Sequence, residues 1–378
     1  MNNISAFQKC SNCGACYNAC PVNAILVKED ELFYRPIVDE AKCLDCGLCR
    51  KMCPVNAPLR AQKTVRAYAA IHNDGQVVQS SSSGGAFHAL AELTLRDGGI
   101  VYGAAYTEGV QKVSMCSTEQ VSLEQLQRSK YVESLVGLSF RDVKEQLETG
   151  REVLYCGAPC QIAGLKRFLG KEYDNLLTCD FSCGGMPSHK MYQQWLDWLE
   201  GKLKSHVTGV DFRAKTFGWF PVALKVWTEK GKAYNRLVTE DPYFDCFTST
   251  HISVRDYCLE CEFANNHYAD IILADLWKYK SISKVDNRNK GISLLITNSE
   301  KGERAIAAIS KQMALTTLEL ESASYNLKDK PVKPGFMNVR RDFLEKCEAV
   351  GFVSAAGKRN YDWKVRLKYK IKKLLGRV

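Results

Sequence analysis

The chain has 378 residues, 46% hydrophobic and 25% charged, and its 52 basic against 42 acidic side chains give a net charge of +10. This length and composition indicate a globular protein of two or three domains and exclude a low-complexity or disordered chain. Residues 358–378 hold nine basic side chains and one acidic side chain, so the remainder is nearly neutral. A protein that binds nucleic acid through a broadly basic surface is therefore not expected.

The hydrophobic runs are too short for a membrane-spanning helix, which needs about 20 apolar residues. Met1–Ser5 has neither the basic start nor the apolar segment of a signal peptide. We therefore expect a cytoplasmic protein in a reducing compartment. Its 17 cysteines are then expected to be ligands or buried thiols and not disulfides.

Residues 10–53 contain two copies of one cysteine pattern, C-x2-C-x2-C-x3-C-P, each followed by Val-Asn-Ala. Aligned from the first cysteine, 9 of 15 positions are identical, which indicates an internal duplication. The spacing is that of bacterial ferredoxins with two 4Fe–4S clusters. Zinc sites do not need the third cysteine and the x3-C-P, and disulfide frameworks suit small secreted domains.

In such ferredoxins the first three cysteines of a copy bind one cluster and the fourth binds the other. This rule assigns two ligand sets, Cys10, Cys13, Cys16 and Cys53, and Cys43, Cys46, Cys49 and Cys20. Gly14 and Gly47 are expected at tight bends where a side chain would crowd the sulfurs. The sequence thus predicts two clusters and a protein that handles electrons.

Between the two cysteine repeats, residues 24–34 predict a β-hairpin with a charged turn, and a short polar stretch at 60–63 predicts the link to the next domain. A strand over 65–72 is followed by Ser80-Ser-Ser-Ser-Gly-Gly-Ala-Phe87, and apolar spacing predicts a helix over 86–96. Small residues at a helix start expose backbone N–H groups to an anion such as a phosphate. A serine N-cap after a flexible turn is the alternative.

Strands and helices then alternate, which predicts an α/β core with a sheet covered by helices. The expected strands are 100–106, 110–116, 153–156, 176–181, several within 207–240, and 270–277, and the expected helices are 139–148, one opening near 159, and one containing 192–199.

Two cysteines, Cys160 and Cys183, follow predicted strands directly, where α/β folds bind ligands. Together with Cys258-x-x-Cys261 they form a possible four-thiolate site. We expect a third 4Fe–4S cluster there, and a zinc site or a redox disulfide is the alternative. The remaining cysteines are expected to be buried structural thiols: Cys116, Cys156, Cys179, Cys246 and Cys347.

An ordered series of motifs covers about residues 65–300: Ser82–Ala86, Ser129–Tyr131, Gly157–Leu165, Cys183 with Pro187–Ser188, Phe212–Lys215 with Gly218–Trp219, Arg255–Ala264, Asp270–Ile271 and Asp275–Trp277. In this order they resemble the β subunit of coenzyme F-420 hydrogenase/dehydrogenase, here with an N-terminal ferredoxin domain. The predicted chain is multidomain α+β/α/β: the cysteine motif predicts a two-cluster ferredoxin domain at 1–60, the resemblance implies an α/β flavin and iron–sulfur core at 61–345, and the charge pattern predicts a basic amphipathic tail at 346–378.

The same resemblance implies FAD beside the additional 4Fe–4S cluster. Ser82, Ser83, Gly84 and Gly85 would hold its pyrophosphate, and Lys130 and Tyr131 would lie near the flavin. Cys160, Cys183, Cys258 and Cys261 would bind the cluster. The chain departs from the family after Cys183, where Gly184-Gly185 replaces a common His-Gly, and at 274–278, where Ala-Asp-Leu-Trp-Lys replaces Gly-Asp-Phe-Trp-Gly. The substrate therefore does not transfer with the fold.

These features lead to an expected iron–sulfur flavoprotein oxidoreductase, since flavins exchange electron pairs and clusters pass single electrons. Its partners would be a soluble carrier such as ferredoxin, or a reduced flavin, deazaflavin or nicotinamide, and a small organic substrate. Candidate catalytic residues are Lys130, Arg213, Lys215 and Asp275. Arg213 and Lys215 either bind an acidic group of the substrate or form a solvated strand edge. The alternative function is an electron-transfer subunit of a larger complex, without its own substrate site.

The C-terminal segment from Trp363 places Leu367, Ile371, Leu374 and Leu375 on one helical stripe among lysines. This pattern predicts a basic amphipathic helix that lies on an anionic membrane or an acidic partner. A terminal helix docked on the domain is the alternative.

Overall fold

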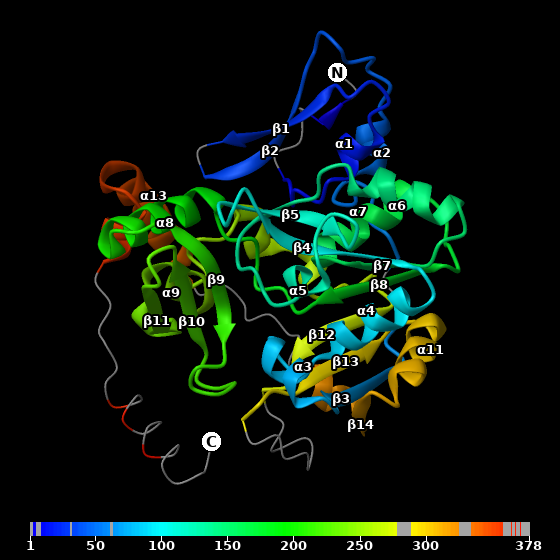
Figure 1. Ribbon diagram of the computed structural model, residues 1–378. Helices are drawn as coiled ribbons and strands as arrows, with labels where there is room; N and C mark the ends of the chain where they lie inside the picture. Colours follow the sequence, from blue (N-terminus) through cyan, green and yellow to red (C-terminus); the bar gives the residue numbers. More distant parts are fainter. Residues whose placement is uncertain are drawn as a thin grey trace.

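The computed structural model describes residues 3–4, 9–30, 32–60, 63–277, 289–324 and 334–357, with single positions 364, 367 and 371. Within them the strands form a nine-stranded sheet, a three-stranded sheet and a two-stranded hairpin. The hairpin and its two short helices form an N-terminal domain at the top of Figure 1. The large sheet lies below it and the three-stranded sheet lies to one side.

The N-terminal domain contains helices α1 (Ala15–Ala19) and α2 (Leu48–Met52) and strands β1 (Ile25–Asp30) and β2 (Phe33–Val38). The strands pair antiparallel, which confirms the predicted hairpin. Each helix starts after a glycine with positive φ, Gly14 at 88° and Gly47 at 73°. At Gly14, however, an added Cβ would lie 2.7 Å from Val136 Cγ1. The nearest atoms that exclude a side chain at Gly14 therefore belong to the core residue Val136, and crowding of the sulfurs stays a prediction.

The large sheet has the strand order β14-β3-β13-β12-β8-β7-β4-β5-β6. Its centre, from β12 through β8 and β7 to β4, is parallel. Because parallel strands need crossovers, helices cover both of its faces. The strand bounds are β3 Arg66–His72, β4 Ile100–Thr107, β5 Lys112–Ser117, β6 Ser134–Leu135, β7 Val153–Cys156, β8 Leu176–Phe181, β12 Ile271–Asp275, β13 Ser293–Thr297 and β14 Met313–Leu318.

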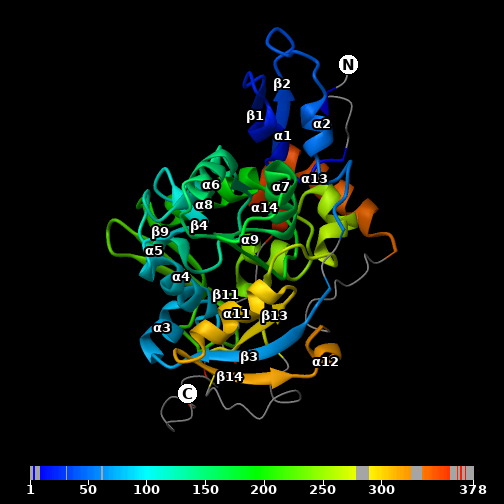
Figure 2. The ribbon, with the colours of Figure 1, turned by 90° about the vertical axis from the view of Figure 1, so that its right-hand side faces the viewer.

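Alternating side chains of β7 divide the core between the two faces of the sheet. Val153 and Tyr155 pack in a cluster with α6 (Ser139–Glu148), α7 (Pro159–Leu169) and α1. Leu154 packs on the other face with α4 (Ala86–Arg96) and α11 (Glu300–Ile309). The N-terminal domain therefore rests on the α6 and α7 face (Figure 2) and shares its apolar core.

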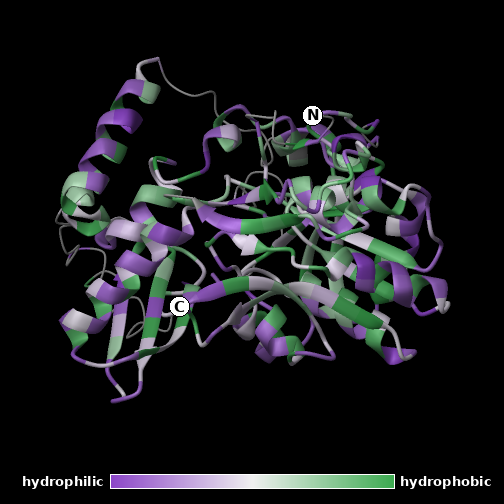
Figure 3. Cartoon of the chain, turned by 90° about the horizontal axis from the view of Figure 1, so that it is seen from above, coloured by the Kyte–Doolittle hydropathy of each residue, from purple (hydrophilic) through white to green (hydrophobic). Residues whose placement is uncertain are grey.

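The three-stranded sheet, β9 (Val207–Ala214), β10 (Ala223–Thr228) and β11 (Ala233–Leu237), is antiparallel. It packs in one aromatic-rich cluster with α8 (His189–Leu203), α9 (Pro242–Thr248), α13 (Phe336–Val350) and α14 (Phe352–Ala356). Figure 3 shows long hydrophobic stretches on the inner strands, whereas the outlying helices alternate between hydrophobic and hydrophilic residues.

The elements expected from the sequence are confirmed, most of them within two residues. The sequence does not predict helices α3 (Gly75–Ser80), α5 (Leu123–Leu126), α9, α11, α12 (Leu320–Ser324), α13 and α14, or strands β6, β13 and β14. The division proposed at 345 lies inside α13. Of the tail predicted at 346–378, the first residues belong to α13 and α14, and most of 358–378 lies outside the described residues. Among the described helices, none has the length and hydropathy required to cross a membrane.

Candidate functional site

Two small cavities lie inside the N-terminal domain. The inner cavity, of about 80 Å³, is lined by Cys10, Cys13, Cys16 and Cys53 among other residues. The outer cavity, of about 20 Å³, is lined by Cys20, Cys43, Cys46 and Cys49 among others. These are the two crossed sets that the duplicated motif assigns. The fourth cysteine of each copy therefore lies with the first three of the other copy.

Backbone N–H groups point at several of these sulfurs. Asn12 N donates to Cys10 Sγ at 3.3 Å, Ala24 N to Cys20 Sγ at 3.2 Å and Asp45 N to Cys43 Sγ at 3.4 Å. Such bonds favour thiolates and tune iron–sulfur clusters. Both cavities thus have the donor chemistry that a cluster requires.

The two cavities differ in their distance from solvent. At the outer cavity Cys46 is exposed and Leu44 beside it is 65% exposed. At the inner cavity Cys13 is buried, and a Cβ added to Gly164 of α7 would lie 3.2 Å from Cys13 Sγ. The outer cavity therefore faces the surface and the inner cavity faces the core.

The four core cysteines, Cys160, Cys183, Cys258 and Cys261, come together beyond the inner cavity. Because β7 and β8 are adjacent and parallel, Cys160 and Cys183 leave the sheet at the same edge. A bridge between Pro187 and Val254 brings the 3-10 turn Asp256–Glu260 against this edge. There Met186 N donates to Cys258 Sγ at 3.4 Å. We call these four cysteines the core thiol set.

The pKa of Cys160 reflects how close the four thiols of this set lie to one another. Burial, followed by the neighbouring thiols of Cys261 and Cys183, raises the pKa of Cys160 well above its usual value. Within the part of the chain that the structure describes, no disulfide joins any two cysteines. In the described part of the chain no three His, Cys, Asp or Glu side chains converge on a single-ion site. A cubane cluster instead takes one thiolate at each of four separate irons.

The Ser82–Gly85 loop precedes α4 and is held on both sides. Ser82 Oγ lies 3.1 Å from Ser129 Oγ and accepts from Ser129 N at 2.9 Å. Ser83 Oγ donates to Ile292 O at 2.7 Å. The N-cap of α4 is Gly85, in the left-handed region with φ 92°, and no side chain caps the helix. The alternative of a serine N-cap is therefore wrong, and the N-terminus is left open.

Two basic candidates, Arg213 in β9 and Lys215 just after it, hold this loop. Lys215 Nζ donates to Ser83 O at 2.8 Å, and Arg213 Nη2 donates to Ser82 O at 3.3 Å. Arg213 also pairs with Asp275 at 2.6 Å and is 6% exposed. The alternative of a solvated strand edge is therefore wrong for Arg213. Three of the four catalytic candidates therefore lie at or beside the Ser82–Gly85 loop: Arg213, Lys215 and Asp275.

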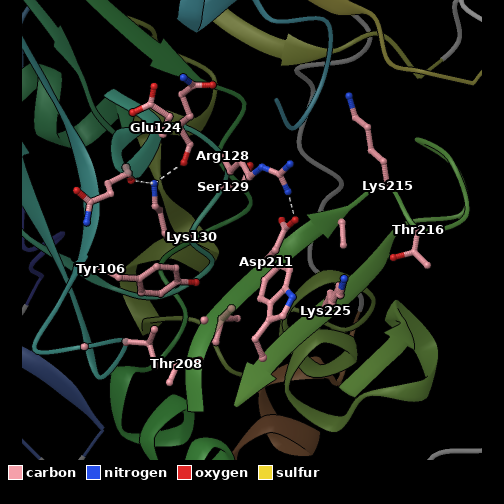
Figure 4. A pocket seen from close by; sticks show the side chains of 18 of the residues that line it. Tyr106, Glu124, Arg128, Ser129, Lys130, Thr208, Asp211, Lys215, Thr216 and Lys225 are labelled. Atoms are coloured by element: carbon pink, nitrogen blue, oxygen red, sulfur yellow. Dashed lines mark hydrogen bonds and ion pairs between the residues drawn. The ribbon is translucent and has the colours of Figure 1, made fainter. Parts of the chain in front are cut away.

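A cavity of about 660 Å³ lies between β9, β10 and residues 124–130 (Figure 4). Two of its lining residues, Ser129 and Lys215, hydrogen-bond to the Ser82–Gly85 loop. Ligand pockets commonly have about 300–1,000 Å³. Its ionisable lining is predominantly basic, with Arg128, Lys130, Lys215 and Lys225 against Glu124 and Asp211. The cavity is therefore suited to an anionic ligand of cofactor size.

Two of these lysines have weakened basicity. Burial lowers the pKa of Lys130 to about 7, and Lys130 Nζ donates to Gln125 O at 2.6 Å. Burial and then the charges of Arg213 and Arg128 lower the pKa of Lys215 to about 7. A bound anion would restore their charge.

One extended segment connects the loop to the core thiol set. At one end Ser129 bonds Ser82, and Tyr131 Oη accepts from Arg213 Nη1 at 3.3 Å. At the other end Glu133 N donates to Pro187 O at 3.1 Å, and Ser134 Oγ accepts from Gln161 Nε2, next to Cys160, at 3.0 Å. Residues 129–134 therefore contact both candidate sites.

Sequence reasoning missed several residues of this region. No sequence motif marks Glu133, Asn12 or Asp211. Glu133 pairs with Arg255 and with Asn12, and Asp211 pairs with Arg128; each partner is more than 80 positions away in the sequence. The cavity is also lined by Lys225 and Trp227 of β10. The sequence pattern of this strand predicts a place in a sheet but no contact with a ligand. No local spacing distinguishes such residues from ordinary polar positions.

Comparisons with known proteins agree with the motifs. Residues 150–323 match the family described as the C terminus of the coenzyme F420 hydrogenase/dehydrogenase beta subunit, and residues 9–57 match the 4Fe-4S dicluster domain. No curated protein matches the chain. A chain of the F420-reducing [NiFe] hydrogenase complex from Methanosarcina barkeri is similar at 20% identity and a TM-score of 0.45, covering 76% of this chain and 90% of that chain.

Proposed function

Because this chain belongs to the coenzyme F420 hydrogenase/dehydrogenase β-subunit-like family and carries a 4Fe-4S dicluster domain, we propose that it is an iron–sulfur flavoprotein oxidoreductase. It passes electrons between an external carrier and a small organic substrate. Two clusters occupy the N-terminal domain, a third occupies the core thiol set, and FAD occupies the 660 Å³ cavity and the adjoining loop.

Several observations support FAD as the bound group. The open N-terminus of α4, which follows Gly85, offers backbone N–H groups to a pyrophosphate, as helix starts commonly do. Arg213 and Lys215 hold this loop in place. The basic lining suits the same negative charge. Bound there, a flavin supplies the exchange between a two-electron organic partner and single electrons.

The observation that carries the proposal is the contact of residues 129–134 with both sites. Tyr131 reaches the β9 arginine, whereas Glu133 reaches the segment that follows Cys183 and Ser134 reaches helix α7, which contains Cys160. The inner cavity lies on the other side of Cys160, whose thiol is 4.0 Å from Ser11 O. The order from the surface is therefore outer cavity, inner cavity, core thiol set and 660 Å³ cavity.

The test is anaerobic quantification of iron, sulfide and flavin in the full chain, with a visible spectrum. Three cubane clusters give about twelve irons per chain, with one FAD. About eight irons and no flavin would contradict the proposal and leave a carrier with two clusters.

We expect an external carrier to dock on the surface around Cys46. Among the described thiol sites, only the outer cavity combines an exposed cysteine with an exposed apolar side chain, Leu44. Leu44→Glu should raise the KM for a reduced ferredoxin about fivefold, because a charge disrupts an apolar interface centre. Rates with a small viologen donor should stay unchanged.

The matched control is Val350→Glu, at a valine on α13 that is 53% exposed. It makes a comparable apolar-to-acidic change away from the N-terminal domain. An equal rise in KM for both variants, or a loss of iron from Leu44→Glu, would contradict docking at Cys46.

The affinity for FAD should depend on pH through Lys215. Its pKa near 7 in the free protein rises when an anion binds, so binding takes up a proton. Affinity is then full below pH 7 and falls as pH rises, by about fivefold between pH 7 and 8. Fluorescence titration of FAD into apoprotein measures this dependence.

Lys215→Met should weaken binding and flatten that dependence, leaving only the contribution of Lys130. Lys225→Met provides the control, since Lys225 lines the same cavity but contacts the Trp227 ring. A pH dependence identical in the Lys215→Met variant and the unsubstituted protein would contradict the assignment.

A second candidate function follows from the family description, which names a β subunit. In that case the chain transfers electrons within a larger complex and has no substrate of its own. Turnover of deazaflavin, nicotinamide or flavin substrates by the isolated holoprotein would argue against it. A stable partner that copurifies and is required for turnover would favour it.

A further inference from the structure

A buried ion pair lies at the junction of the N-terminal domain and the core. It joins Arg255 Nη2 to Glu133 Oε1, with side chains 3% and 0% exposed. Glu133 also accepts from Asn12 Nδ2 at 3.0 Å and from Tyr34 N at 3.1 Å. Arg255 Nη2 donates to Tyr34 O at 2.6 Å. The pair therefore belongs to the core but binds the N-terminal domain.

The pair also touches both thiol sites. Arg255 lies close enough to Cys10 of the inner cavity and Cys258 of the core thiol set to interact electrostatically with each thiol. Its carbonyl accepts from Cys258 N at 3.0 Å. On the other side Asn12, which binds Glu133, donates its backbone N–H to Cys10 Sγ at 3.3 Å. A positive charge thus lies between the two sets of sulfurs.

One polar atom of this pair has no partner. The Arg255 Nε–H is buried, and among the described residues nothing accepts from it. A buried donor without an acceptor costs free energy. The sulfurs of a bound cluster are acceptors of the kind that such a donor lacks.

Both members are charged in the folded protein. Burial alone would raise the pKa of Glu133. The charge of the Arg255 guanidinium outweighs burial, together with hydrogen bonds from His189, Arg255 and Tyr34 N–H, and the pKa of Glu133 lies below its usual value. Buried ion pairs often stabilise a fold no better than well-packed apolar residues. Stability alone is therefore a weak reason for this pair.

We propose that Arg255 and Glu133 set the reduction potentials of the clusters at the inner cavity and the core thiol set. This inference rests on the proposed function. A cluster gains negative charge on reduction, so the Arg255 cation favours its reduced form and raises its potential. Glu133 offsets part of that effect. Both are positioning residues that act through the clusters, and they keep the two clusters matched for electron transfer.

The experiment is an EPR-monitored redox titration of the holoprotein at one pH, with three variants. Arg255→Gln should lower the potentials of the inner-cavity and core clusters. Glu133→Gln should raise them, because the arginine charge is no longer offset. Arg255→Lys, which keeps the charge, should stay closer to the unsubstituted protein. The outer-cavity cluster serves as an internal control and should not move.

Arg151→Gln is the matched control, since Arg151 pairs with Glu119 at the opposite end of β7 from Cys160. Opposite shifts in the Arg255→Gln and Glu133→Gln variants, which a merely structural role does not produce, support the inference. Unchanged potentials, or shifts of equal sign, overturn it. Should Arg255→Gln fail to assemble clusters, Glu133→Gln decides alone. An unsubstituted protein without three cubane signals overturns the proposed function itself.

Discussion

Replacing Cys258 by serine should remove one cubane from the protein and leave the others in place. Iron should fall from about twelve to about eight per chain, while the absorbance of the N-terminal clusters and the FAD content persist. Electron transfer from a reduced ferredoxin to the flavin should slow by at least about a hundredfold. Outer-shell changes at metal sites already cost 10- to 100-fold, and this change removes a direct ligand.

Cys246→Ser provides the matched control. Cys246 is 2% exposed and belongs to the aromatic cluster around α8 and α9, apart from the core thiol set. This variant should keep all irons and the rate of flavin reduction, apart from a modest loss of thermal stability. Equal iron content in both variants would contradict a third cluster at Cys258.

Replacing Gly84 by alanine should largely abolish flavin binding. Gly84 N donates to Ser293 Oγ at 3.0 Å, and an added Cβ would lie 2.7 Å from Ser293 N and also against Ala70 O. These are backbone atoms of β13 and β3, which have no room to move. Overpacking of this kind costs about 1–3 kcal/mol, and about 1.4 kcal/mol corresponds to tenfold in affinity. The FAD affinity should therefore fall at least about tenfold.

The control for this change is Gly75→Ala at the start of α3. No atom lies within 4 Å of its added Cβ, so the same substitution meets open space. It should leave FAD affinity unchanged and stabilise the helix slightly, since alanine favours a helix over glycine. Absorbance of the purified proteins at flavin wavelengths and their Tm values report both effects. Full FAD retention by Gly84→Ala would contradict a cofactor at this loop.

The Ser82–Gly85 loop illustrates what a sequence leaves open. Its serine and glycine run predicts a helix start and an anion site, and α4 indeed begins at Ala86. Which residues hold the loop does not follow from the run, because Ser129, Arg213 and Ile292 come from distant segments. Likewise the orphan Nε–H of Arg255 becomes visible only when burial and every neighbour are known.

By itself, the sequence determined the two-cluster motif, because cluster ligands at fixed short spacings are a local property of the chain. It also determined most strands and the helices α4, α6, α7 and α8, since hydrophobic periodicity depends on neighbouring residues. Only the tertiary structure decided that Cys160 and Cys183 meet Cys258 and Cys261, and that Arg255 pairs with Glu133. These contacts depend on strand order and on which loops leave the same sheet edge. Such pairings bring together residues more than 70 positions apart, and no local pattern encodes them.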